Sequence, residues 1–408
     1  MWKNWQRYLF KVETEFRRGK FVIIIYLFGI KIIRKKYSIS YGAPDIVHNV
    51  FNTKHKKKML LSYITSAFKP NMNIYSHTNY TECRTWAQIF NELGYQVDVV
   101  NWDQKIDIDI AQYSVVCGFG FPYEKALFCN NIKKFFYAPG CNPDFSNIVS
   151  IKRVQDFYSK TGVLAPDSAR VTPYDNRTQL YFSDLIVTLG NDFVANTYSE
   201  YKNVKKLDIF CYKTCDISIV DKDFEKYRNN FLFFGSSGAI HKGLDIVLDF
   251  FMAHPELNLT VCGVSHYETA FREYYSDAIN GKYKNITFHS FIDLTSEAFR
   301  KIMQTHCAFV SPSASEGGAA AALTVMTNGG LLPIISRASG LDLEEYGVIM
   351  NDVSHQAFEQ AVAQYLQMST TQIKDICIKC QADISQKHTY DKYKTRLKQY
   401  VTQALNNE

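Results

Sequence analysis

The sequence predicts an α/β protein with two domains, each built on a parallel sheet that has helices on both faces. The chain has 408 residues, which is enough for two domains of ordinary size. Hydrophobic residues make up 46% and charged residues 21%, a composition typical of globular proteins with ample core material. Short apolar runs alternate with helical patterns along most of the chain, and this alternation indicates parallel sheets.

The first half contains a predicted strand–helix–strand unit. A short strand is expected at Asn73–Ser76 and leads into a polar loop that begins with His77. A helix is expected at 84–93, closed by Gly94, and a strand at 95–100. Ligands bind at the carboxyl ends of parallel strands, so His77 is a candidate site residue. Further strands are predicted at 114–117, 134–137 and 185–189.

The second half repeats the alternation more clearly. A strand at 230–234 enters the glycine-rich loop 235–243, which is followed by a helix at 244–252. A polar stretch at 216–229 predicts that the boundary between the halves falls near residues 205–229. The later elements are predicted as strands at 257–264, 286–291 and 308–311, and as helices at 268–279, 296–303 and 388–405.

The stretch 309–336 carries the most specific signal of the chain. It predicts a strand, a loop with the acidic residue Glu316, a helix opened by small residues, and a second buried strand. Gly317, Gly318 and Ala319 leave backbone N–H groups uncovered at the start of that helix, which favours an anion. A phosphate would repel Glu316, so this carboxylate is expected to bind hydroxyl groups. Hydroxyl groups beside a phosphate indicate a sugar nucleotide.

These residues also resemble a known family. Ser315-Glu316-Gly317, the small-residue helix with Met326, and the strand at 333–335 are similar to the donor-site signature of retaining glycosyltransferases with the GT-B fold. The similarity is to the glycogen-synthase-like and sucrose-synthase-like group, which includes enzymes of capsule and lipopolysaccharide synthesis. It covers the C-terminal part of the chain well and the N-terminal half loosely. It implies two Rossmann-like domains facing a central cleft, with a C-terminal helix that crosses back to the N-terminal domain.

The resemblance assigns roles to the two acidic positions of the donor signature. In the family, the first acid contacts the sugar hydroxyls, which implies this role for Glu316. The second acid lies eight residues later and contacts the ribose, where this chain has Thr324. Thr324 keeps only hydrogen-bonding capacity.

The loop 235–243 resembles the family element whose Arg and Lys lie against the donor diphosphate. Lys242 matches the Lys, while the position of the Arg is nearest to Ser236, after Gly235. A single ammonium still offers a point charge for phosphate. Lys242 and Glu316 are therefore the predicted catalytic residues, and His241 is a further pocket candidate.

The loop 137–147 resembles a turn found in some capsule and lipopolysaccharide glycosyltransferases. Gly140 and Asn142 are placed with His77 on the acceptor side of the predicted cleft. The expected domains are a basic N-terminal segment at 1–60, an acceptor domain at 61–215, a donor domain at 216–387 and the C-terminal helix at 388–408.

Residues 1–60 are strongly basic. They contain 14 Lys or Arg and three acidic residues, which gives a charge of +11, against about −5 for the rest of the chain. Basic residues flank the apolar run Phe21–Ile30, which is too short to span a bilayer and has no cleavage site after it. We expect contact with an anionic membrane surface, hence a cytoplasmic protein that is peripheral on the inner face of the membrane. The alternative is a buried strand or helix with solvated basic flanks. No nucleic-acid partner is expected, because no binding motif is present.

No metal or other cofactor is expected besides the nucleotide-sugar substrate. The ten cysteines are scattered, as in a reducing compartment, and Cys377 and Cys380 are interpreted as one face of a helix rather than as metal ligands. The acidic pairs at 107–109 and 221–223 are interpreted as chance occurrences rather than as ligands of a divalent cation.

The sequence therefore predicts a glycosyltransferase that moves a sugar, with retention, from a nucleotide sugar to a glycan or lipid-linked acceptor in bacterial surface-polysaccharide assembly. Two alternatives stay open. One is a sugar-nucleotide epimerase on the same fold, which would need more proton-handling groups near Glu316. The other is a weakly active binding module, since Thr324 and Ser236 replace the usual Glu and Arg.

Overall fold

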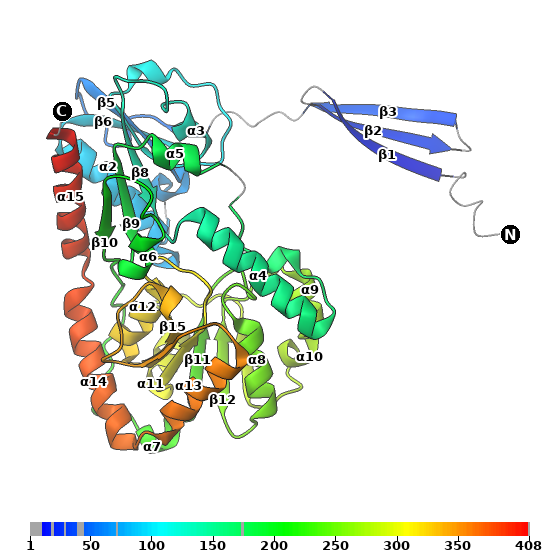
Figure 1. Cartoon of the computed structure of the whole chain (residues 1–408), viewed down its shortest axis with the longest axis vertical. Coiled ribbons are helices and arrows are strands. Elements are labelled where there is room, and N and C mark those ends of the chain that lie inside the picture. Colours follow the sequence, from blue (N-terminus) through cyan, green and yellow to red (C-terminus); the bar gives the residue numbers. More distant parts are fainter. Residues whose placement is uncertain are drawn as a thin grey trace. The chain divides into compact units, whose positions relative to one another are not determined.

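The structure, a computed structural model, describes residues 10–17, 20–27, 30–38, 45–70, 72–172 and 175–406, with side chains from residue 45 onward. The chain forms two compact units, residues 1–46 and 47–408. The first unit contains an antiparallel three-stranded sheet (Figure 1). Its strands are β1 (Phe10–Arg17), β2 (Lys20–Leu27) and β3 (Ile30–Ser38). In the apolar run at 21–30, the backbone of residues 21–27 therefore belongs to strand β2.

The N-terminal half of the second unit is built on a seven-stranded sheet. Its strand order is β10-β9-β8-β7-β5-β6-β4, and the pairs from β6 to β10 are parallel. Buried aliphatic and aromatic side chains fill the central strands, as both faces of a parallel sheet require. The strands are β4 (Ile46–Val47), β5 (Lys57–Tyr63), β6 (Tyr95–Asn101), β7 (Val115–Gly118), β8 (Lys133–Ala138), β9 (Leu185–Leu189) and β10 (Val204–Leu207).

The strand predicted at Asn73–Ser76 was wrong. Residues Ile74–Ser76 form a 3-10 helix, because the Asn73 side chain accepts a hydrogen bond from the Tyr75 N–H (3.0 Å) and turns the chain locally. The strand that precedes the first helix of this sheet is β5 instead. Strand β5 begins inside a run of lysines, and for this reason its short apolar stretch was not predicted as a strand.

The C-terminal half contains a six-stranded parallel sheet. Its strand order is β13-β12-β11-β14-β15-β16, and every pair is parallel. The order reverses between β11 and β14, and the crevice beyond the carboxyl ends of two such strands is where doubly wound sheets bind ligands. The strands are β11 (Asn230–Phe234), β12 (Asn258–Cys262), β13 (Ile286–His289), β14 (Ala308–Ser311), β15 (Leu332–Ser336) and β16 (Val348–Met350).

Helices cover both sheets, and the predicted fold class, two Rossmann-like halves in the GT-B arrangement, is confirmed (Figure 1). The last helix leaves the C-terminal half and packs on the N-terminal half: the Tyr400 hydroxyl donates to the Lys206 carbonyl (2.9 Å). The principal helices are α2 (Thr78–Glu92), α4 (Pro143–Thr161), α8 (Leu244–Ala253), α11 (Glu297–Thr305), α12 (Ala320–Gly329), α13 (His355–Gln367), α14 (Thr370–Lys387) and α15 (Tyr390–Asn406). Shorter helices are α3 (Phe121–Glu124), α5 (Arg177–Tyr181), α6 (Asp192–Asn196), α7 (Phe224–Tyr227), α9 (Thr269–Tyr274) and α10 (Ser276–Ile279).

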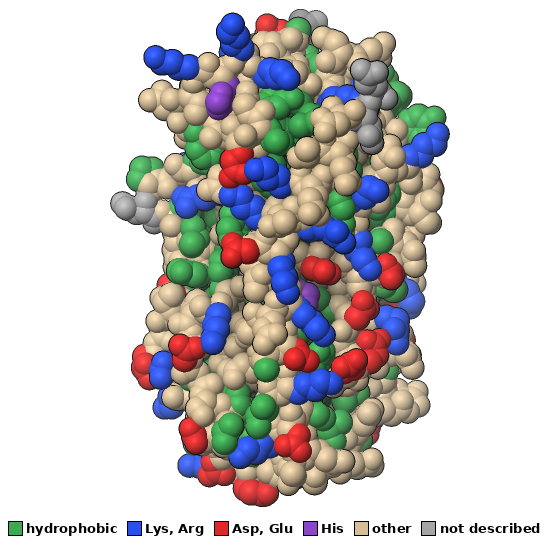
Figure 2. Space-filling view, turned by 90° about the vertical axis from the view of Figure 1, so that its left-hand side faces the viewer, with side chains coloured by type: hydrophobic (Ala, Val, Ile, Leu, Met, Phe, Trp, Pro, Cys, Tyr) green, Lys and Arg blue, Asp and Glu red, His purple; other side chains and the backbone are tan. Residues whose placement is uncertain are grey.

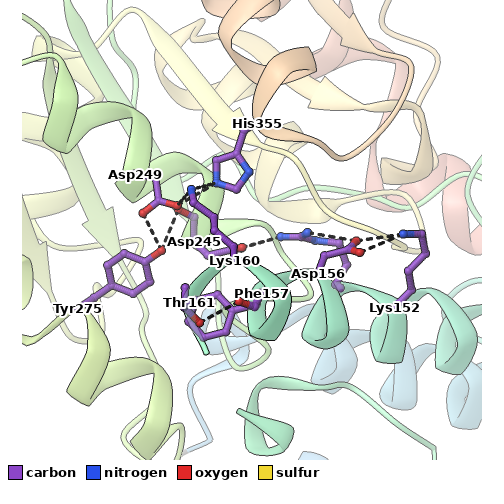
Figure 3. Close-up of polar contacts among 10 residues, drawn as sticks. Lys152, Asp156, Phe157, Lys160, Thr161, Asp245, Asp249, Tyr275 and His355 are labelled. Carbon is purple, nitrogen blue, oxygen red and sulfur yellow. Dashed lines mark hydrogen bonds and ion pairs between the residues drawn. The ribbon is translucent and has the colours of Figure 1, made fainter. Parts of the chain in front are cut away.

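Helix α4 follows a strand of the N-terminal sheet but reaches across to the C-terminal half (Figure 1). Its Arg153 donates two hydrogen bonds to Asp245 of α8 (2.7 and 2.9 Å), and both residues are buried. Lys160, at the end of α4, lies against Asp249 and His355 (Figure 3). These charges join the two halves through one helix.

The face that carries α14 and α15 mixes basic and acidic side chains without a large area of one sign (Figure 2). Such mixing is typical of a solvated surface. Among the described residues, no helix is both long and apolar enough to cross a membrane.

The two thiols of α14 and one acid of each acidic pair have structural partners. Cys377 and Cys380 lie inside α14 and their thiols point to the carbonyls of Cys307 and Leu331. Asp109 and Asp223 each cap the start of a short helix. In the described part of the chain, no three His, Cys, Asp or Glu residues form a group that could hold a metal ion.

His306 precedes β14 and contacts both α11 and β12. Its Nδ1 lies 3.0 Å from the Ile302 carbonyl and its Nε2 lies 2.8 Å from the Thr260 hydroxyl. Burial lowers the pKa of His306 to about 4, so the ring is neutral at pH 7.

We expect His306 to make the protein less stable as the pH falls from 6.5 toward 4. In this window His306 is protonated in the unfolded chain but stays neutral in the folded chain. This difference removes about 2 kcal/mol of the free energy of unfolding by pH 5. Urea unfolding at pH 7.5 and pH 5 measures the loss. His306→Gln should reduce it, whereas His266→Gln, at an exposed position, is the control and should not. An equal loss in the wild type and His306→Gln would contradict the assignment.

Candidate active site

The loops after β11 and β14 bring Lys242 and Glu316 together. These two strands are neighbours at the point where the strand order reverses, so their loops open into the same crevice. The Lys242 ammonium makes a short ion pair with Glu316 Oε1, and only 13% and 16% of the two side chains are exposed. The two residues that the sequence predicts as catalytic therefore lie in contact, although 74 positions separate them.

Two further groups hold the Glu316 carboxylate. The Ser313 hydroxyl donates to Oε1 (3.0 Å), and Arg170 Nη1 lies 3.7 Å from Oε2. Burial by itself would raise the pKa of Glu316, but Lys242 and Arg170 outweigh it and lower the pKa to about 2. Glu316 is thus ionised at neutral pH. It can accept hydrogen bonds from hydroxyl groups but cannot supply a proton.

A second buried carboxylate shapes the loop that carries Lys242. Glu268, 1% exposed, accepts hydrogen bonds from the backbone N–H groups of Gly238 and Ala239, both at 2.7 Å. These bonds turn the loop between β11 and α8 so that the Lys242 ammonium reaches Glu316. Burial lowers the pKa of Lys242, and Arg170 adds to this effect, while Glu316 opposes it.

The glycines after Glu316 allow the two halves to touch. A Cβ on Gly317 would lie 2.0 Å from the Pro139 carbonyl oxygen, so only glycine fits there. Gly318 has a φ of +77°, and Ala319 has an unusual φ of 20°. Within the described residues, the N–H groups of these three residues make no hydrogen bond. These are the N–H groups that the sequence analysis assigned to an anion, and the binding of an anion there stays a prediction.

His241, adjacent to Lys242, supports the Glu316 loop. Its ring is 1% exposed and its Nε2 lies 2.9 Å from the Ser315 carbonyl oxygen. Burial lowers the pKa of His241 to about 4, so this ring is neutral at pH 7 and donates from Nε2. The Ser315 hydroxyl in turn lies 2.7 Å from that of Ser146 on α4.

The structure brings two of the three predicted acceptor-side residues to this place. His77 caps the start of α2 by accepting from the Asn79 N–H (3.1 Å), and it lies close enough to Lys242, Arg170 and Glu316 for their charges to act on its ring. A Cβ on Gly317 would lie 2.7 Å from the Gly140 Cα.

The third predicted acceptor-side residue, Asn142, has structural partners. Only 3% of it is exposed. Its side chain accepts from the Asp144 N–H at the start of α4 (2.9 Å), and its own N–H donates to the Thr197 hydroxyl (2.8 Å).

Of the remaining predicted donor-site residues, two lie on the loop after β11 and one lies on α12. Gly235 sits at the end of β11, where an added Cβ would be 3.3 Å from Lys242 Cδ. Ser236 is exposed beside it. Thr324 is 4% exposed on α12, and its carbonyl accepts from the Asn328 side chain (2.8 Å).

Three residues near Glu316 were missed at the sequence level: Arg170, Glu268 and Ser313. Arg170 and Glu268 lie far from both loops in the sequence and belong to no motif. Ser313 could have been found, because it lies three positions before Glu316 in the loop already singled out.

No protein-family model and no curated protein sequence matches this chain. Solved structures do match its fold. A complex of Anabaena HepE with UDP and glucose has a TM-score of 0.53 at 14% identity, covering 87% of this chain and all of that one. A glycosyltransferase from Rickettsia africae gives 0.53 at 11% identity, with the same coverage. The catalytic domain of starch synthase IV from Arabidopsis thaliana, bound to ADP and acarbose, gives 0.51 at 10% identity over 97% of this chain and 88% of that one.

We expect Glu268→Gln to destabilise the protein by about 1–3 kcal/mol, because an amide replaces one acceptor oxygen and leaves a buried N–H of Gly238 or Ala239 unpaired. Thermal unfolding measures the effect. The matched control is Glu273→Gln, at an exposed position of helix α9, which begins directly after Glu268. It should leave the melting temperature unchanged. An unchanged melting temperature in Glu268→Gln would show that the loop does not depend on this carboxylate.

Proposed function

We propose that this protein is a glycosyltransferase that takes a sugar from a nucleotide sugar. The observation that carries the proposal is the contact of Lys242 with Glu316 beyond the carboxyl ends of β11 and β14. A cation for phosphate and an ionised acceptor for hydroxyl groups are what a nucleotide sugar requires. The likeness to solved glycosyltransferase structures supports the fold on which this chemistry would take place.

In the proposed reaction the protein acts by electrostatics and positioning. Lys242 and the N–H groups of Gly317, Gly318 and Ala319 would stabilise the departing nucleoside diphosphate, which keeps the electron pair of the broken glycosidic bond. Glu316 would orient the sugar through its hydroxyl groups. An acceptor hydroxyl would form the new bond on the face that the diphosphate leaves and pass its proton to a phosphate oxygen, which gives retention without a metal ion.

The finer parts of the proposal concern the acceptor and its setting. We assign the donor to the C-terminal half and the acceptor to the N-terminal half, beside His77 and Gly140. A glycan or lipid-linked acceptor in bacterial surface-polysaccharide assembly is the proposed class. The proposed class of acceptor rests on the resemblance of the loops 137–147 and 235–243 to those of known glycosyltransferases.

A nucleotide-sugar-binding module with weak activity is the second candidate. The observation that favours it is the short Lys242–Glu316 ion pair, because a cation already neutralised by a carboxylate attracts phosphate less. Stabilisation by a nucleotide sugar in a thermal-shift screen, with no hydrolysis or transfer to any glycan or lipid acceptor, would favour the module over the enzyme.

Two substitutions test the catalytic pair. Lys242→Met should lower both nucleoside-diphosphate affinity and transfer by at least about tenfold, since it removes a charge-assisted hydrogen bond worth about 1.5–3 kcal/mol. Glu316→Gln should lower transfer similarly but retain or increase nucleoside-diphosphate affinity, because it releases Lys242 from a competing carboxylate. Calorimetric titration and a transfer assay separate the two effects.

An ion pair of the same residue types offers the matched control. Lys379 and Glu345 pair at 2.8 Å on the surface, with 50% and 69% of their side chains exposed. Lys379→Met and Glu345→Gln should leave both affinity and transfer at wild-type values. Wild-type transfer in Lys242→Met or Glu316→Gln would remove the basis of the site assignment.

We also propose that residues 1–60 attach the protein to the cytoplasmic face of an anionic membrane. The support is their charge of +11 and the apolar run between basic flanks. The side chains of Arg34, Lys35 and Lys36 lie outside the described residues. Attachment would bring the cleft close to a lipid-linked acceptor.

Binding of the protein to anionic vesicles should weaken markedly from low to high salt, because each basic residue near the surface contributes about 1 kcal/mol and salt screens it. Neutralising Arg34, Lys35 and Lys36 together should weaken binding further. Co-sedimentation with anionic and neutral vesicles measures this. Equal binding to both kinds of vesicle, or to neither, would contradict the proposal.

A further inference from the structure

We propose that Arg170, a residue of the N-terminal half, is the second diphosphate-binding cation of the donor site. This inference rests on the proposed function and adds a residue to it. Arg170 Nη1 lies 3.7 Å from Glu316 Oε2, while Lys242 holds Oε1 of the same carboxylate. The two cations thus flank one carboxylate from opposite halves of the fold.

The charges around Lys242 explain why a second cation is needed. Two carboxylates act on Lys242: Glu316 in direct contact and Glu268 on the neighbouring loop. His241 is neutral at pH 7, because its pKa is lowered to about 4. Without Arg170, one ammonium would face two carboxylates, and the site would repel a diphosphate. Arg170 balances the second negative charge.

Contacts with both halves hold Arg170 at this position. Its backbone N–H donates to the buried Ser150 hydroxyl of α4 (2.8 Å). Nearby, the Asp167 carboxylate accepts from the Thr269 N–H of the C-terminal half (2.8 Å). The Arg170 stem packs on Gly238, where an added Cβ would lie 2.5 Å from its Cγ and Cδ. The Lys242 loop therefore leaves space for Arg170 by having a glycine there.

The guanidinium of Arg170 has donors available for a ligand. Its five N–H groups form a planar fork suited to phosphate oxygens. In the part of the chain that the structure describes, the guanidinium makes no hydrogen bond, and its contact with Glu316 at 3.7 Å is longer than one. Because 45% of the side chain is exposed, a diphosphate can approach it from the solvent side.

The test measures how affinity depends on phosphate in the full chain. Arg170→Gln should lower the affinity for UDP or ADP, whichever the wild type binds, by about tenfold or more, since it removes a charge-assisted contact. The affinity for the corresponding nucleoside, followed by saturation-transfer NMR, should stay unchanged. Arg177→Gln is the matched control: this exposed Arg of the same half pairs with Asp144 at 2.6 Å, and its loss should change neither affinity.

A rescue separates a phosphate contact from a structural role. Ser236 is exposed on the Lys242 loop, so Arg170→Gln combined with Ser236→Arg should restore diphosphate affinity toward the wild-type value. If Arg170→Gln does not fold, Arg170→Lys is used, and it should lower diphosphate affinity without changing nucleoside affinity.

The outcomes distinguish this inference from the proposed function. Wild-type diphosphate affinity in the folded Arg170 variant, or equal losses for diphosphate and nucleoside, would overturn the role of Arg170 and leave the function standing. A wild-type protein that binds neither UDP, ADP nor their sugar derivatives would overturn both.

Discussion

The buried ion pair of Arg153 and Asp245 fixes the geometry on which the candidate site depends. Arg153 belongs to α4 of the N-terminal half and Asp245 to α8 of the C-terminal half, and the two residues are 6% and 1% exposed. A buried charge without its partner is strongly destabilising, so this contact admits little sliding of α4 along α8. The segment after α4 carries Arg170, and its place beside Glu316 follows from that contact.

The C-terminal helix forms a second connection between the halves, in the opposite direction. Its Tyr393 hydroxyl lies 3.4 Å from that of Tyr137 in the N-terminal sheet, and Tyr137 donates to the buried Glu82 carboxylate (2.7 Å). Lys394 and Lys398 both pair with Glu92 on α2. With α4 crossing one way and α15 the other, the two halves can approach closely enough for Gly317 to touch the backbone at 139–140.

The electrostatics of the site depend on burial and on which groups donate hydrogen bonds to each carboxylate. Glu268 is held by two backbone N–H groups, so it shapes a loop and acts on Lys242 only through its charge at a distance. Glu316 is satisfied by side chains from three different segments, which a ligand could replace. The same residue type thus serves as a structural anchor at one position and as a candidate ligand-binding group at the other.

The sequence by itself determined the alternation of strands and helices, and with it the fold class, because hydrophobic periodicity and glycine positions are local signals. Its failure at Asn73–Ser76 has the same cause: an asparagine side chain bonding to the backbone overrode a short apolar pattern. It also singled out Lys242 and Glu316, which lie in glycine-rich loops directly after buried strands. Only the tertiary structure decided that Arg170 and Glu268 join them, because their roles arise from contacts between segments distant in the sequence, and no local pattern records such contacts.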